Sequence, residues 1–266
     1  MNLLNGNPAS SISIFDRGFM YGDGVFETVL VKNRNPKDID KHYERLISGC
    51  NALNIKNIDI ETIISYVNKS LSDQTDCILN IIITRGDSLS RGYRYNDFKF
   101  IPNIVTITSE LPIYKKDYEK IGVDTKFSNY IISKNKNLSK IKHLNRLEQI
   151  IASQDISDEY PEVIMCDKND NIIEGVSSNI FFISSEGVKT PKILDCGVEG
   201  ITRNKIIEYL KMEKENIEVC DIKKDEISQF KSAFFCNTVR GIWQINSIEK
   251  TKFGSIDLIK NIRANI

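Results

Sequence analysis

Lys142 stands in residues 141–149 (IKHLNRLEQ), directly before a run of apolar residues with helical spacing. A lysine in this position is commonly a solvated surface residue. It becomes a nucleophile when burial or a nearby positive charge lowers the pKa of its amine, and the amine then forms a Schiff base with an aldehyde such as that of pyridoxal phosphate. Lys142 is therefore a candidate for covalent attachment of an aldehyde, with a surface role as the alternative.

Glu174 lies in residues 173–182 (IEGVSSNIFF), at the end of one predicted strand and just before another. An acidic residue at a strand end is commonly part of a solvated turn. The functional interpretation is more specific. A carboxylate that faces a pyridine nitrogen keeps the ring protonated, so that the ring accepts electrons from a carbanion.

Residues 197–203 (GVEGITR) form a double-glycine turn that leads into a predicted helix. The glycines could simply end a loop. Alternatively, the N–H groups of Ile201 and Thr202 converge with the helix dipole where a phosphate would bind, and Thr202 adds a hydroxyl. This segment is therefore a candidate anion site.

Residues 235–243 (FCNTVRGIW) interrupt an apolar strand pattern with Asn237, Thr238 and Arg240. These polar residues form either an ordinary turn or a tip that faces a ligand.

The elements that position these residues are predicted by apolar periodicity. In the first hundred residues, strands are expected at 11–15, 25–31, 78–84 and 98–108, and helices at 38–53 and 60–71. The second half predicts strands near 123–128, 162–166, 171–173, 179–183, 217–220, 233–236 and 242–245, with helices from about 144 to 154 and from 202 to 212. The pattern indicates an α+β protein.

A polar stretch around Pro112 predicts an interdomain connection at residues 111–120. The connection would separate a small N-terminal domain, residues 1–110, from a larger C-terminal domain, residues 121–266.

The chain carries 36 Lys and Arg against 36 Asp and Glu, so its formal net charge is zero. This balance argues against a dedicated nucleic-acid or anionic-membrane binder. Apolar runs are far shorter than the roughly 20 residues of a membrane span, and the N-terminus lacks the pattern of a signal peptide. The six cysteines show no metal-ligand spacing. We therefore expect a cytoplasmic protein without a bound metal, a nucleic-acid partner or a membrane partner.

Together the four segments resemble the class-IV aminotransferase family, the fold-type IV enzymes that use pyridoxal phosphate. Residues 16–31 (DRGFMYGDGVFETVLV) resemble the opening turn and strand of that family, and residues 42–46 (HYERL) resemble its helix with a phosphate-binding arginine. The signature positions that match in type and spacing are Glu174, Asn179, Thr190, Gly200 and Arg203, whereas Val176 stands where the family usually has a smaller residue. The resemblance implies an α+β fold like that of D-amino-acid aminotransferases, with the cofactor between a small N-terminal and a larger C-terminal α/β domain.

The resemblance also implies a role for each matching residue. Lys142 would hold the aldehyde of pyridoxal 5'-phosphate, and Glu174 would face its pyridine nitrogen. The implied phosphate ligands are Arg45, Ile201, Thr202 and Thr238, a set of guanidinium, amide and hydroxyl donors that suits a dianion. Members of the family are generally dimers, so a homodimer is expected.

Within the family, KHLNRLEQ, residues 90–93 (SRGY) and residues 236–243 (CNTVRGIW) resemble the aminodeoxychorismate lyases. These enzymes eliminate pyruvate from 4-amino-4-deoxychorismate and yield 4-aminobenzoate for folate synthesis. The substrate is a small dicarboxylate, which requires cationic and amide donors. The candidates are Arg91, Asn237 and Arg240, with Thr28 and Tyr93 as further candidates; Arg91 could instead pair with Asp87 on the surface.

Two alternatives stay open. The first is a D-amino-acid or branched-chain aminotransferase of the same family, which Glu27 permits, although Phe26 lacks the hydroxyl of the tyrosine found in D-amino-acid aminotransferases. The second is a non-catalytic homologue that binds the cofactor. The presence of both Lys142 and Glu174 argues against it, because a carrier has little use for an electron sink.

Overall fold

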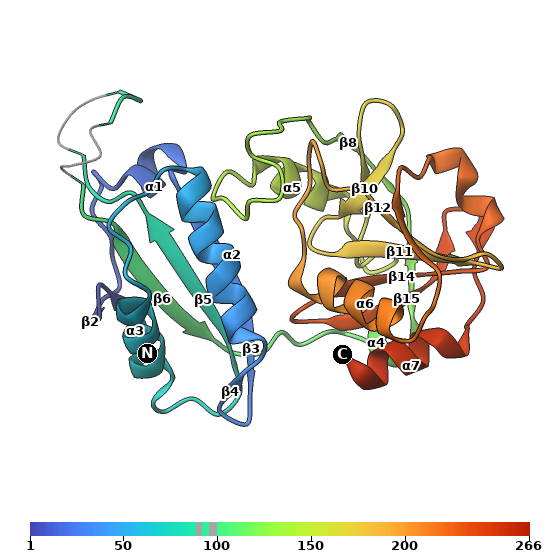
Figure 1. Cartoon of the computed structure of the whole chain (residues 1–266), viewed down its shortest axis with the longest axis horizontal. Coiled ribbons are helices and arrows are strands. Elements are labelled where there is room, and N and C mark those ends of the chain that lie inside the picture. Colours follow the sequence, from blue (N-terminus) through green and yellow to red (C-terminus); the bar gives the residue numbers. More distant parts are fainter. Residues whose placement is uncertain (89–91, 96–99) are drawn as a thin grey trace. The chain divides into compact units, whose positions relative to one another are not determined.

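The computed structural model describes residues 1–88, 92–95 and 100–266 and divides into two compact units (Figure 1). The first unit contains Met1–Pro112 and Ile141–Asn145, and the second contains Ile113–Lys140 and Arg146–Ile266. The polar stretch around Pro112 predicted a single continuous C-terminal domain, residues 121–266. The return of five residues to the first unit was not predicted, because it depends on hydrogen bonds to a strand far earlier in the chain.

Within its described residues, the first unit is built on a six-stranded antiparallel sheet with strand order β2-β1-β6-β5-β3-β4. The strands are β1 (Leu3–Leu4), β2 (Asn7–Pro8), β3 (Gly24–Lys32), β4 (Asn35–Pro36), β5 (Cys77–Thr84) and β6 (Asn103–Ser109). The helices are α1 (Arg17–Tyr21), α2 (Ile39–Ala52) and α3 (Ile60–Leu71).

Alternation along β3 and β5 places one row of side chains in the core of this unit. Val25, Val29 and Val31 lie opposite Ile83, Leu79 and Cys77, and all six are buried with residues of α2 and α3. Both helices therefore cover the same face of the sheet. Every second residue of the strands and the apolar face of each helix point into this core.

Residues 11–15 were predicted as a strand, and this prediction is wrong. These residues form no strand, and Ile14 and Phe15 are exposed. Asp16 follows and begins α1 by accepting a hydrogen bond from the Phe19 N–H. The short apolar alternation misled the prediction, because no neighbouring strand in the described part of the chain pairs with it.

The second unit contains a seven-stranded and a three-stranded sheet among its described residues. The seven-stranded sheet has the order β13-β12-β11-β14-β15-β16, with β7 also paired to β15, and the three-stranded sheet has the order β10-β9-β8. The strands are β7 (Val123–Thr125), β8 (Phe127–Ile131), β9 (Ile164–Cys166), β10 (Ile172–Gly175), β11 (Asn179–Ser184), β12 (Gly187–Pro191), β13 (Ile217–Cys220), β14 (Ser232–Asn237), β15 (Gly241–Ile248) and β16 (Thr251–Lys252). The helices are α4 (Tyr118–Ile121), α5 (Leu147–Ala152), α6 (Ile201–Met212) and α7 (Asp257–Asn265), with 3₁₀ helices η2 (Ser153–Asp155) and η3 (Lys224–Gln229).

The core of the second unit lies on both faces of the seven-stranded sheet. Phe181 and Phe234 stack with ring centroids 5.0 Å apart and pack with buried residues of α6 and α7. Their neighbours Phe182 and Phe235 face the other way, toward a cluster that includes residues of the three-stranded sheet. The large sheet is thus apolar on both faces, which explains the unbroken apolar run along β11.

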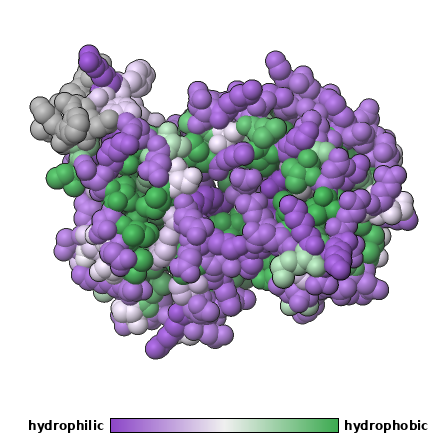
Figure 2. Space-filling model, viewed as in Figure 1, coloured by the Kyte–Doolittle hydropathy of each residue, from purple (hydrophilic) through white to green (hydrophobic). Residues whose placement is uncertain are grey.

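The visible surface in Figure 2 is largely polar, with apolar residues in separate patches. Among the described residues, no helix has the length and apolar character that crossing a bilayer requires.

Candidate active site

Lys142 lies in an extended segment beside β3 in the first unit. Its carbonyl accepts a hydrogen bond of 2.9 Å from the Phe26 N–H, and the Leu144 N–H donates to the Gly24 carbonyl over 3.0 Å. The Lys142 Nζ atom lies 4.1 Å from the centre of the Phe26 ring. The predicted helix start at residue 144 is wrong, because these backbone bonds keep the chain extended and α5 begins only at Leu147. The main chain of Lys142 is therefore anchored to β3.

Arg45 projects from α2 and forms an ion pair with Glu27 of β3. The guanidinium donates from Nε and Nη2 to the two carboxylate oxygens over 2.7 and 2.6 Å. Glu27 also pairs with His42 Nδ1 at 2.7 Å. The predicted phosphate ligand thus has a fixed orientation within the first unit.

Glu174 is buried at the end of β10 in the second unit, with 4% of its surface exposed. Its Oε2 accepts a hydrogen bond of 2.8 Å from the Val198 N–H. Gly197 has φ +87°, and a Cβ there would lie 3.2 Å from the same oxygen. The loop before α6 therefore approaches Glu174 closely and holds its carboxylate in place.

The start of α6 has the features of an anion site. Gly200 is the N-cap, and among the residues that the structure describes no side chain caps the first turn. Thr202 Oγ1 lies 3.4 Å from Thr238 Oγ1, so two predicted phosphate ligands from distant segments meet at this helix end. A Cβ at Gly200 would lie 2.1 Å from Asn179 Oδ1, so the position requires glycine for space.

These observations fit the phosphate and pyridine groups of pyridoxal phosphate. Amide donors with the positive end of a helix dipole and two hydroxyls suit a phosphate. A buried carboxylate suits a protonated ring nitrogen.

Arg240 donates to the fully buried Glu162 over 2.5 Å, and its guanidinium lies 4.7 Å from the centre of the Trp243 ring. Glu162 also accepts from the Val176 N–H and the Ser177 hydroxyl, both at 2.8 Å. Glu162 was not among the site residues predicted from the sequence. Its position before β9 gives no local signal, because its partners come from two other segments.

Asn237 organises the turn between β14 and β15. Its side-chain oxygen accepts from the Val239 and Arg240 N–H groups, and its amide donates to the Ser177 carbonyl over 2.9 Å. Asn237 and Arg240, predicted substrate ligands, are thus brought together with residues 176–177. Val176, the departure from the family pattern, lies in the same region and packs against a small core cluster.

The remaining predicted substrate ligands belong to the first unit. Thr28 donates to Asn80 Oδ1 over 3.0 Å on the sheet face opposite α2. Tyr93 is 83% exposed, with its ring 5.5 Å from that of Tyr21. Arg91 lies outside the described residues.

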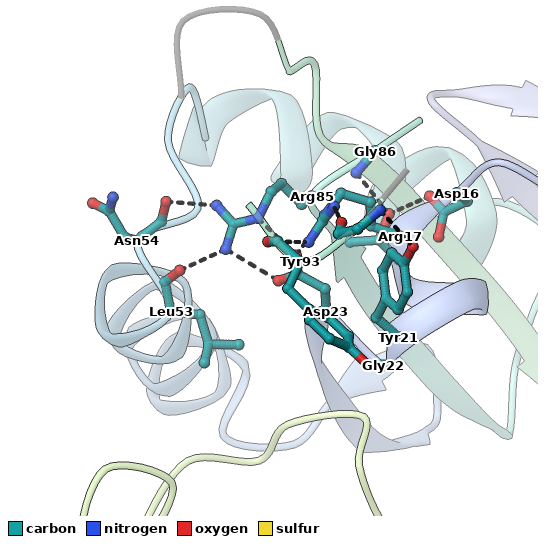
Figure 3. A network of polar contacts seen from close by, with 12 residues as sticks. Asp16, Arg17, Tyr21, Gly22, Asp23, Leu53, Asn54, Arg85, Gly86 and Tyr93 are labelled. Atoms are coloured by element: carbon teal, nitrogen blue, oxygen red, sulfur yellow. Dashed lines mark hydrogen bonds and ion pairs between the residues drawn. The ribbon is translucent and has the colours of Figure 1, made fainter. Parts of the chain in front are cut away.

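Figure 3 shows how the Tyr93 backbone is held. The Arg17 guanidinium donates to the carbonyls of Gly92 and Tyr93 over 3.2 and 3.1 Å and also pairs with Asp23. Asp23 bridges to Arg85, which donates to the carbonyls after α2. This network ties residues 92–93 to α1 and to the end of α2.

The sequence model of the family described as Amino-transferase class IV matches residues 24–248. The chain belongs to this family. Its fold agrees with solved structures of the family, including the branched-chain amino acid aminotransferase of Escherichia coli, with a TM-score of 0.88 at 18% identity over 98% of this chain and 91% of that one. The predicted α+β fold of fold-type IV is confirmed.

Within the family, the chain is similar to the aminodeoxychorismate lyase of Vibrio harveyi, with 26% identity over 269 residues, 99% of this chain and 98% of the relative. The solved 4-amino-4-deoxychorismate lyase of Pseudomonas aeruginosa superposes with a TM-score of 0.94 at 28% identity and covers 100% of this chain and 97% of that one. The D-alanine aminotransferase of Bacillus licheniformis is 25% identical over 251 residues, 92% of this chain and 86% of the relative.

Proposed function

We propose that this protein is a pyridoxal-phosphate-dependent lyase that converts 4-amino-4-deoxychorismate into 4-aminobenzoate and pyruvate. The observation that carries this proposal is the similarity to the Pseudomonas aeruginosa lyase along the full length of both chains. The similarity to a second lyase over nearly the whole of both sequences supports it.

Lys142, Glu174, Arg45, Ile201, Thr202 and Thr238 are the proposed cofactor ligands. When bound, pyridoxal phosphate supplies an electron sink for the electron pair left behind by proton removal. Glu174 keeps the ring nitrogen protonated, and its bond from Val198 fixes the carboxylate for this task. Ile201 and Thr202 present donors at the start of α6, beside the Thr238 hydroxyl.

Lys142 is the proposed general base. Its amine takes the proton from the substrate carbon that carries the amino group. The bond from the neighbouring carbon to the enolpyruvyl oxygen then breaks, and the oxygen leaves with the electron pair of that bond. The enolpyruvate takes up a proton and becomes pyruvate, while the remaining ring becomes aromatic. The anchoring of Lys142 to β3 limits where its amine can move.

Asn237, Arg240, Arg91, Thr28 and Tyr93 are the proposed substrate ligands. Arg240 is already paired with Glu162, so we expect it to share its charge between Glu162 and a substrate carboxylate. Asn237 fixes this turn and so sets the position of the guanidinium.

The direct test supplies enzymatically generated 4-amino-4-deoxychorismate and follows the fluorescence of 4-aminobenzoate together with released pyruvate. We expect equal amounts of both products. A parallel reaction with D-alanine and 2-oxoglutarate tests the aminotransferase alternative. Reaction in the second assay alone would overturn the lyase assignment and leave the family intact.

Lys142→Ala tests the role of the lysine. We expect it to abolish both turnover and the visible absorbance of the lysine-bound cofactor, because the variant has no amine at this position. Lys136→Ala, which removes a lysine with an 82% exposed side chain, is the matched control and should leave both unchanged. Full activity in Lys142→Ala would exclude the proposed mechanism.

A homodimer, carried over from the family resemblance, and a cytoplasmic location, expected from the sequence alone, are further parts of this proposal. Light scattering of the purified protein tests the first, and fractionation of cells tests the second.

A further inference from the structure

The ion pair between Glu27 and Arg45 is largely buried. The Glu27 side chain is 1% exposed and the Arg45 side chain 18% exposed. Two parallel hydrogen bonds fix the plane of the guanidinium, and they use two of its five N–H donors.

His42 completes the arrangement from the same helix as Arg45. Its Nδ1 lies 2.7 Å from Glu27 Oε2. Because an ionised carboxylate only accepts hydrogen bonds, Nδ1 is the donor. Nε2 of His42 is buried and has no hydrogen-bond partner among the described residues, so Glu27 is the partner that orients the ring.

Glu27 remains ionised in this setting. Burial acts to raise its pKa, but the hydrogen bonds from Arg45 and His42 outweigh burial and hold the pKa below its ordinary value. The carboxylate is therefore a permanent anchor for the arginine at neutral pH.

We propose that Glu27, held by His42, is a positioning residue that aims the Arg45 guanidinium at the phosphate of the cofactor. This inference rests on the proposed function, since it takes Arg45 as a phosphate ligand. Glu27 does not touch the cofactor in this scheme, and it acts through the arginine.

The direction in which Glu27→Gln changes phosphate affinity distinguishes positioning from simple charge neutralisation. If Glu27 only reduced the charge of Arg45, then Glu27→Gln would strengthen phosphate binding. If Glu27 positions Arg45, the variant loses one of the paired acceptors, and phosphate binding weakens. Removal of an outer partner of a metal ligand lowers affinity on the order of 10- to 100-fold, and we expect about a tenfold loss here.

The experiment titrates the cofactor-free protein with pyridoxal phosphate and, separately, with pyridoxal, and follows the visible absorbance that develops on attachment to Lys142. The dissociation constant for pyridoxal divided by that for pyridoxal phosphate is the phosphate preference. In Glu27→Gln we expect this ratio to fall about tenfold, with little change in affinity for pyridoxal. If Glu27 had a purely structural role, Glu27→Gln would weaken the binding of both compounds equally and leave the ratio unchanged. An unchanged or an increased ratio overturns the inference.

Arg45→Gln supplies a double-mutant cycle. If Glu27 acts through Arg45, then Glu27→Gln has no further effect on the ratio in the Arg45→Gln background. Asp23→Asn is the matched control, because it breaks another buried ion pair of the same unit, with Arg17 and Arg85. It should lower the thermal stability without lowering the ratio, and a fall as large as that in Glu27→Gln counts against the inference.

His42 variants decide the question if Glu27→Gln does not fold. Both variants retain Glu27 and Arg45. His42→Asn keeps an N–H near the position of Nδ1, whereas His42→Leu removes it. We expect a lower ratio for His42→Leu than for His42→Asn, and equal ratios would overturn the inference. A wild-type protein that does not attach pyridoxal phosphate would instead overturn the proposed function.

Discussion

Glu174 has two separable properties, its charge and its hydrogen bond from Val198. Glu174→Gln keeps an acceptor for that N–H and removes the charge. We expect the cofactor to stay attached through Lys142, while turnover falls on the order of 100-fold because the ring nitrogen loses its anionic partner. Stopped-flow absorbance with the substrate measures this step, and an unchanged rate would remove Glu174 from the site.

At the residue scale, residue types and their spacing in the sequence identified the candidate site residues, but not the residues that hydrogen-bond to them. Lys142 and Glu174 are visible in the sequence because their chemistry is specific and their surroundings match a family pattern. Glu162, which holds Arg240, gave no such signal, because its partners are the Arg240 guanidinium and the 176–177 turn. Sequence motifs thus name the groups that do chemistry more readily than the groups that orient them.

The start of α6 depends on the absence of a side chain at Gly200. A Cβ would meet Asn179 Oδ1 at 2.1 Å, which forces the Asn179 side chain to shift and disturbs its hydrogen bond to the Val198 carbonyl. We expect Gly200→Ala to cost about 1–3 kcal/mol of unfolding free energy and to weaken phosphate binding. Gly254→Ala is the control, since its nearest neighbour is 3.8 Å away, and it should be neutral in the same thermal melts. Equal stability of the two variants would contradict this account.

Asp167, in the turn between β9 and β10, stabilises the folded protein at neutral pH but not at strongly acid pH. Burial raises the pKa of Asp167, but the hydrogen bonds from Lys134, Asn171 and the backbone outweigh it and hold the pKa at about 2. Because the folded-state pKa is depressed, this stabilisation is present above about pH 4 and is lost as the pH falls toward 2.

Asp167→Asn should remove this dependence. We expect the variant to be less stable than the wild type at pH 6 by on the order of 2 kcal/mol, with a difference that shrinks between pH 4 and pH 2. Urea unfolding across this range measures it. Asp158→Asn, at an exposed pair with Lys115, serves as the control and should change little. A difference that stays constant with pH would show that Asp167 acts by packing alone.

At the element scale, amphipathic patterns predicted α2, α3 and β3 closely, because apolar residues recur regularly on one face of each. Several elements were not predicted, among them α1, α4 and β12. The segment 141–145 has helix-compatible residues, yet bonds to β3 keep it extended. The last helix, α7, was not predicted, although Ile259 and Ile262 bury its inner face.

At the scale of the whole molecule, five residues of the C-terminal half complete the N-terminal unit. Ile141 is 9% exposed and belongs to the core of that unit. Ile141→Ala should cost about 2–4 kcal/mol and should speed amide exchange at Phe26, whose N–H donates to Lys142. Leu147→Ala, at a 70% exposed position, is the control. Unchanged exchange at Phe26 would show that the packing of Ile141 does not anchor the segment.

The same return of the chain has a consequence for fragments of the protein. The connection at Pro112 and Ile113 is open to a protease, since Ile113 is 95% exposed. A cut there yields one fragment that lacks part of its own fold and a second that carries the missing piece, residues 141–145. We expect the nicked protein to run as one species in gel filtration and to separate only in denaturant, because the second fragment remains hydrogen-bonded to β3 of the first.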